Sequence, residues 1–197
     1  MTSDANAGAL DAGLDAALVF AEISDPSVTL SYLDKLLHNA VDKAFPAKTS
    51  TVNKGIQFHT SQIDSHEVIP TGKQLILKLM EISDPTSATN FLISKLNDKK
   101  PKIPPTCLEV IRNGITLFGI QCFPVKEIIK SLSAVFNGTN GPAREAAMAL
   151  IVEIHRWVGL APLQVVHISL NYFFSGPYFT LYSLLGAFGL IEKRPEE

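Results

Sequence analysis

Two histidines and two carboxylates in one polar stretch are the nearest approach to a reactive site in this sequence. His59 and His66 have Asp64 and Glu67 close by, which raises the question of a bound metal ion. Their spacing matches no common ligand motif, so exposed loop residues are the favoured interpretation and no metal is expected. The sequence also has no glycine-rich phosphate loop and no nucleophile with a base beside it. It therefore predicts a protein that is not an enzyme and needs no cofactor.

Side chains that could bind a partner are concentrated in polar turns. The net charge of -2 and the pI near 6.2 give no global reason to expect nucleic acid, so any electrostatic recognition must come from a local patch. Lysines recur in the segments 48–54 and 97–102, and an arginine follows the turn NGTNG at 137–141. The candidate binding residues are Lys48, Thr51, Val52, Lys54, Lys99, Lys100, Lys102 and Arg144.

The composition is that of a folded domain. With 197 residues, 46% of them hydrophobic and 18% charged, the chain is long enough for one sizeable core and too apolar for wholesale disorder. Cys107 and Cys122 have apolar neighbours, which predicts buried thiols in a reducing compartment. The N-terminus has no basic stretch followed by an apolar core, so no signal peptide is readable and the cytosol is favoured.

Apolar residues recur at steps of three and four, which predicts helices almost throughout. One helix is expected to stop before Pro26, and Ser27 is expected to cap a second that runs to Pro46. Further helices are expected around 91–96, from Pro104 to Gly119, over 125–136 and over 142–158. The prediction is an all-α solenoid of antiparallel helix pairs, in which the sequence EISDP, present at 22–26 and 81–85, links one pair to the next.

The period of these pairs indicates an insertion. Successive pairs end near Gly119 and Val158, a spacing of about 40 residues, which is typical of HEAT and armadillo repeats. The two EISDP copies lie 59 positions apart, which is too long by 18 or 19 residues. The segment 55–72 is polar, lacks helical periodicity and has 18 residues. It is the expected non-helical insert, and its removal would join 52–54 to 73–80 in one amphipathic helix.

Four blocks of the chain resemble the TOG domain of the microtubule-polymerase family, and in particular its first, N-terminal TOG domain. They occur in the family's order: GLDAALVF (13–20), KAFPAKTSTVNKG (43–55), LNDKKPKIPPTCLEVIRNGITLFG (96–119) and AREAAMALIVEIHRWVG (143–159). The resemblance implies a paddle of HEAT repeats that binds the αβ-tubulin dimer along one edge, formed by the turns inside each pair. It also implies a role at growing microtubule plus ends, in the cytoplasm and cytoskeleton, including the spindle or centrosome-like organising centres.

Matched position by position, Lys102 and Arg144 correspond to basic contact residues of the family, and the turn from Thr51 to Lys54 to another contact turn. Since tubulin is acidic, cations held rigidly at one edge would bind it in a salt-sensitive way. Arg144 has an equal alternative as a member of an internal hydrogen-bond ladder. Lys99 and Lys100 have the alternative of solvated turn charges.

The chain also departs from the family. Met1 lies almost at the second repeat's turn, so the family's first repeat is expected to be missing and residues 1–160 are expected to form a partial domain. The resemblance is expected to fade in residues 161–197, which are aromatic-rich and carry no Asp, Glu, Lys or Arg up to Ile191. This tail could pack on the solenoid, anchor the chain in a membrane through 163–191, or be translated non-coding sequence, which is the most economical interpretation.

Three functions follow, with tubulin binding first. The alternatives are a generic helical-repeat scaffold for another protein and a membrane-tethered adaptor that depends wholly on the tail.

Overall fold

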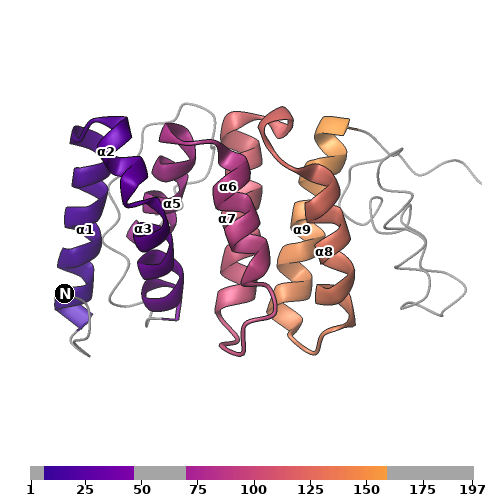
Figure 1. Cartoon of the computed structure of the whole chain (residues 1–197). Coiled ribbons are helices and arrows are strands. Elements are labelled where there is room, and N and C mark those ends of the chain that lie inside the picture. The colour runs from indigo at the N-terminus through magenta and orange to yellow at the C-terminus, as the bar shows by residue number, and fades with distance from the viewer. Residues whose placement is uncertain (1–6, 47–69, 159–197) are drawn as a thin grey trace, which may run out of the picture.

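The computed structural model describes residues 7–46 and 70–158, and these residues form a two-layered row of helices (Figure 1). One layer contains α1 (Ala7–Ile23), α5 (Thr71–Ile82), α7 (Ile103–Phe118) and α9 (Gly141–Val158). The other contains α2 (Pro26–Ser31), α3 (Leu33–Asn39), the π-helical η1 (Ala40–Ala44), α6 (Pro85–Ser94) and α8 (Val125–Asn137). A 3₁₀ turn, η2 (Ile120–Cys122), joins α7 to α8.

The order of the helices confirms the predicted solenoid of antiparallel pairs. Within the first layer α1 packs on α5, α5 on α7 and α7 on α9, so each pair contacts its neighbours in sequence order. The helices α5, α7 and α9 end at Ile82, Phe118 and Val158, which gives the HEAT-like spacing that the sequence predicted. A single core of buried aliphatic side chains, including Leu18, Leu75, Ile111 and Leu150, runs through the row.

Both EISDP copies are turns between pairs, and each uses its aspartate as the helix cap. Asp25 accepts a hydrogen bond from the Ser27 N–H at 2.8 Å, and Asp84 accepts one from the Thr86 N–H at 3.0 Å. The following proline occupies the first helical position, where its missing N–H costs nothing. The expected cap at Ser27 was therefore wrong, because Ser27 donates to Asp25 instead. These bonds from Ser27, its hydroxyl first and its N–H second, lower the pKa of Asp25.

The expected helix from Ser27 to Pro46 is interrupted. It breaks at Tyr32 into α2 and α3, and its last turn widens into the π-helical η1. Leu30, an apolar residue of the short α2, is 42% exposed. Ala44 of η1 packs against α5 so closely that a Cβ on Gly72 would lie 2.7 Å from the Ala44 Cβ.

The expected insert ends earlier than the sequence indicated. Thr71 and Gly72 are buried and form the first turn of α5, with Pro70 as the residue before it. The sequence placed them in the insert because the surplus of 18 or 19 residues matched the length of the polar segment 55–72, which lacks helical periodicity. The rest of the expected insert, 55–69, and the expected tail, 161–197, lie outside the described residues. No helix that the structure describes, in 7–46 or 70–158, is long and apolar enough to cross a membrane.

Candidate functional site

The turns inside the helix pairs lie together at one edge of the row, and we call this the intra-pair edge. It contains the α6–α7 turn (97–102) and the α8–α9 turn (138–140), which lie on the lower side in Figure 1. The turns between pairs, including both EISDP copies, lie on the opposite side and form the inter-pair edge (Figure 1). The two edges are separated by the length of the helices, so a flat partner surface can contact only one of them.

The α6–α7 turn presents three lysines to solvent. Asp98 Oδ1 accepts a hydrogen bond from the Lys100 N–H at 2.9 Å, and the buried side chain of Leu96 anchors the start of the turn. The side chains of Lys99, Lys100 and Lys102 are exposed. Lys102 lies at the N-terminal end of α7, where its carbonyl accepts a hydrogen bond from Thr106 Oγ1 at 2.8 Å. The backbone of this turn is therefore fixed, and its three lysine side chains remain accessible to solvent.

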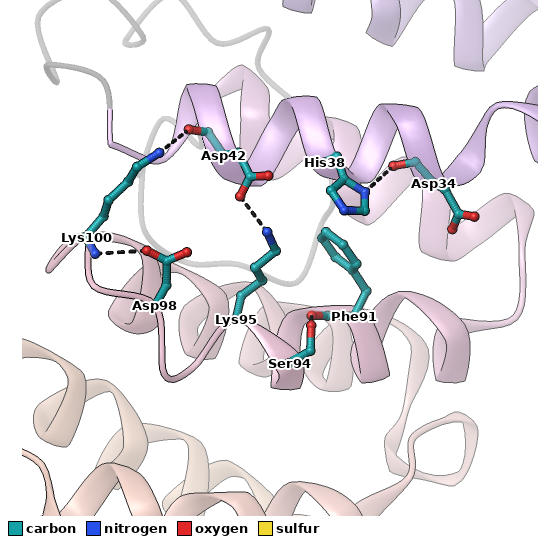
Figure 2. Close-up of polar contacts among 8 residues, drawn as sticks. All are labelled: Asp34, His38, Asp42, Phe91, Ser94, Lys95, Asp98 and Lys100. Carbon is teal, nitrogen blue, oxygen red and sulfur yellow. Dashed lines mark hydrogen bonds and ion pairs between the residues drawn. The ribbon is translucent and has the colours of Figure 1, made fainter.

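Asp42, in the π-helical η1 of the preceding repeat, contacts this turn from the neighbouring helix pair. Its carboxylate lies 2.7 Å from the ammonium of Lys95, and its carbonyl accepts a hydrogen bond from Lys100 Nζ at 3.1 Å (Figure 2). Pro46, four residues beyond Asp42, has no N–H with which to continue the helical hydrogen bonding to that carbonyl. A cation at a helix C-terminus also meets the negative end of the helix dipole. Lys100 is thus a helix-capping residue as well as an exposed cation.

The α8–α9 turn is joined to the α6–α7 turn by Asn140. Its Oδ1 accepts a hydrogen bond from the Ala143 N–H at 3.2 Å, which caps α9, and its Nδ2 donates to the Pro101 carbonyl at 2.9 Å. One side chain therefore fixes the start of α9 and ties it to the residue before Lys102.

Arg144 lies in the first turn of α9 and is half-buried. Its N–H donates to the Asn140 carbonyl at 3.1 Å. Its guanidinium makes no hydrogen bond or ion pair with any residue in 7–46 or 70–158, so the described part of the chain gives no support to the internal ladder that the sequence left open. The contact role stays a prediction.

The remaining candidates lie outside the described residues. These are Lys48, Thr51, Val52 and Lys54, together with the polar group His59, Asp64, His66 and Glu67. Among the residues that the structure does describe, no cluster of three or more His, Cys, Asp or Glu side chains could hold a metal ion.

Charge differs between the two edges. The inter-pair edge carries the exposed acidic residues Glu22 and Asp25 in one turn and Glu81 and Asp84 in the next. Lysines dominate the α6–α7 turn on the intra-pair edge, although Asp98 accompanies them. The two EISDP turns and the α6–α7 turn therefore show the segregation that the sequence predicted, whereas the turns at 119–124 and 138–140 carry no charged residue.

The expected pair of buried thiols is half correct. Cys107 is fully buried in α7, and burial raises the pKa of its thiol far above the usual range. Cys122 is exposed in η2, and its thiol lies 3.7 Å from the Phe118 carbonyl. The apolar residues on either side of Cys122 are buried at η2, whereas the side chain of Cys122 is exposed.

Sequence reasoning missed three residues that build the edge, namely Asp42, Lys95 and Asn140. Asn140 had a local signal, because an asparagine before Gly-Pro at a helix start is typical of an N-cap. Asp42 and Lys95 had none, since their partners are remote in sequence.

A stack of helix pairs with a fixed, lysine-bearing edge defines a helical-repeat binding domain. The family described as "XMAP215/Dis1/CLASP, TOG domain" matches residues 1–171, and the chain belongs to this family. The match spans the segment 55–72 and continues to residue 171, into the part of the chain where the resemblance is expected to fade.

Three relatives illustrate the membership. Protein mini spindles of Drosophila melanogaster is 28% identical over 162 residues, which cover 82% of this chain and 7% of that protein. Spindle pole body component alp14 of Schizosaccharomyces pombe is 22% identical over 157 residues, or 80% of this chain and 17% of the relative. Centrosomal protein 224 of Dictyostelium discoideum is 27% identical over 93 residues, or 47% and 5%. The chain therefore corresponds to a small part of each relative's length.

Proposed function

We propose that this chain is a tubulin-binding module that regulates microtubule assembly, and that it contacts the αβ-tubulin dimer through its intra-pair edge. The observation that carries the proposal is the exposed cluster of Lys99, Lys100 and Lys102 on a turn whose backbone is fixed by Asp98 and Asn140. Membership of the TOG family supports tubulin as the partner. Binding, and not catalysis, is the activity we assign.

The distribution of charge favours the intra-pair edge over the inter-pair edge as the binding surface. Exposed cations in water gain little individually, but several of them held close together attract an acidic surface and accelerate its encounter. The inter-pair edge presents Glu22, Asp25, Glu81 and Asp84 instead and would be repelled. Lys102 and Arg144 are the contacts we propose in the described turns, and Lys48, Thr51, Val52 and Lys54 extend the same edge in the sequence.

Cytoplasm and cytoskeleton are the proposed location. Two of the relatives are named for the spindle pole body and the centrosome, and another for the spindle itself. Microtubule plus ends are the proposed site of action within that location.

The test is the affinity of the full chain for unpolymerised αβ-tubulin, measured by fluorescence anisotropy. Lys102→Ala and Arg144→Ala should each weaken binding about fivefold, the order expected for an interaction of roughly 1 kcal/mol. Lys126→Ala is the matched control, because Lys126 is an exposed lysine in the first turn of α8, next to the inter-pair edge.

Two results would contradict the proposal. The first is no binding by the unmodified chain. The second is binding that Lys126→Ala weakens as much as Lys102→Ala does, which would favour a generic helical-repeat scaffold without a dedicated basic edge.

A further inference from the structure

Side-chain bonds cross between successive repeats at the intra-pair edge. Lys95 and Lys100 join the α6–α7 turn to Asp42 at the end of η1, with a 2.7 Å ion pair and a 3.1 Å hydrogen bond (Figure 2). Asn140 joins the α8–α9 turn to Pro101 at 2.9 Å. Three consecutive repeats are therefore connected at this edge by polar side chains in addition to the packing of their helices.

The inter-pair edge is built differently. In the described turns there, each aspartate bonds within its own turn, Asp25 to Ser27 and Asp84 to Thr86. These bonds cap helices but do not fix one turn relative to the next. In the described turns, hydrogen bonds and ion pairs between successive repeats therefore occur at the intra-pair edge, which carries the lysines.

We propose that Asn140 and Asp42 are positioning residues of the tubulin-binding edge. Their role is to set the distance between cations of different repeats before the partner arrives. The inference rests on the proposed function and adds to it two uncharged or acidic residues that a search for basic contacts overlooks. Neither residue needs to contact tubulin for this role.

The path from Lys102 to Arg144 shows how Asn140 acts. Pro101 precedes Lys102 directly, and its carbonyl accepts from Asn140 Nδ2. The Asn140 carbonyl in turn accepts from the Arg144 N–H at 3.1 Å. The two proposed contacts, remote in sequence, are thus joined by two hydrogen bonds through one residue. Without the amide the two turns can move apart, and binding must then restrict that motion at a cost in affinity.

Asn140→Ser should remove one of the two hydrogen bonds of this side chain and keep the other. Serine is also a good N-cap and can keep the acceptor for the Ala143 N–H, but it has no amide to reach the Pro101 carbonyl. The substitution leaves the net charge unchanged. Asn137→Ser is the matched control, because Asn137 is an exposed asparagine at the end of α8, beside the same turn.

The experiment measures tubulin affinity for the full chain in five forms: unmodified, Asn140→Ser, the control Asn137→Ser, Lys102→Ala, and the double variant of Asn140→Ser and Lys102→Ala. Circular dichroism confirms that each form is folded at the temperature used. Asn140→Ser should weaken binding about three- to tenfold, the order of one neutral hydrogen bond. The dependence of log Kd on log salt should keep its slope, since no charge is lost. In the Lys102→Ala background the effect should be clearly smaller, because the residue being positioned is absent.

The outcomes separate this inference from the proposed function. Binding by the unmodified chain that Asn140→Ser leaves unchanged overturns the positioning role alone. An equal loss with and without Lys102 also overturns it, since that is the behaviour of a residue that only stabilises the fold. An equal loss in the Asn137→Ser control has the same meaning. Failure of the unmodified chain to bind tubulin overturns the proposed function and the positioning role together.

Discussion

The ammonium nitrogen of Lys95 lies 2.7 Å from Oδ1 of Asp42, although the two residues are 53 positions apart in the sequence. Their side chains are only 19% and 33% exposed, and the turn that follows Lys95 carries the exposed lysines. This ion pair connects η1 of one repeat to the end of α6, just before the α6–α7 turn, in the next repeat. The shape of the intra-pair edge therefore depends on a contact between repeats.

The Asp42–Lys95 pair should have a measurable coupling energy. A double-mutant cycle of Asp42→Ala and Lys95→Ala, followed by urea unfolding, should give about 1 kcal/mol, since partial burial reduces screening of the pair. The comparison pair is Lys78 and Glu81, an i,i+3 pair at 2.9 Å on α5 whose carboxylate is 56% exposed. Its coupling should be about 0.3 kcal/mol. A coupling for Asp42–Lys95 no larger than this would show that the pair does not hold the turn.

Two helical glycines, one packed closely and one exposed, should respond in opposite ways to substitution by alanine. Gly72→Ala should destabilise the fold by about 1–3 kcal/mol, because the new Cβ would lie 2.7 Å from the Cβ of Ala44. Gly13→Ala should stabilise it by about 0.5–1 kcal/mol, since Gly13 is exposed inside α1 with nothing within 4 Å of its added Cβ. Thermal or urea unfolding measures both changes. A neutral Gly72→Ala would mean that α5 does not begin against Ala44.

Burial of Cys107 predicts a loss of stability in alkali. Burial raises the pKa of this thiol, so the folded chain keeps its proton at pH values where the unfolded chain, with an ordinary thiol pKa of about 8.5, releases it. The stabilisation is complete below about pH 8.5 and falls above it by about 1.4 kcal/mol per pH unit. Urea unfolding between about pH 8 and 9.5 measures the slope, and Cys107→Ala should flatten it. An equal slope in both proteins would assign the effect to other groups.

Much of the fold could be predicted because it depends on local patterns. Apolar spacing predicted the helices, prolines at 26, 46, 85 and 142 marked their boundaries, and the repeat period predicted their pairing. The period also predicted an extra segment between the two EISDP copies, most of which, 55–69, lies outside the described residues. Its expected end at Gly72 was wrong, because Thr71 and Gly72 belong to α5, where Gly72 packs against Ala44.

The parts that could not be predicted depend on contacts between distant residues. Nothing near Asp42 in the sequence indicates that Lys95 and Lys100 will lie beside it. The π-helical turn that contains Asp42 has no sequence pattern that distinguishes it from an α-helix. Cys122 and Leu30 have apolar surroundings in the sequence, yet both are exposed because a short helical turn rotates them outward. Which lysines are tied and which face solvent is likewise settled only by packing.

Site-directed photo-crosslinking to αβ-tubulin tests most directly which edge binds. In a Cys122→Ser background, a benzophenone is attached through Thr139→Cys or Gln121→Cys; Thr139 is exposed on the intra-pair edge and Gln121 on the inter-pair edge, while Cys107 is buried and protected from the label. We predict a tubulin adduct from position 139 that diminishes as salt is raised, and none from position 121. Adducts of equal yield from both positions, or from position 121 alone, would contradict it.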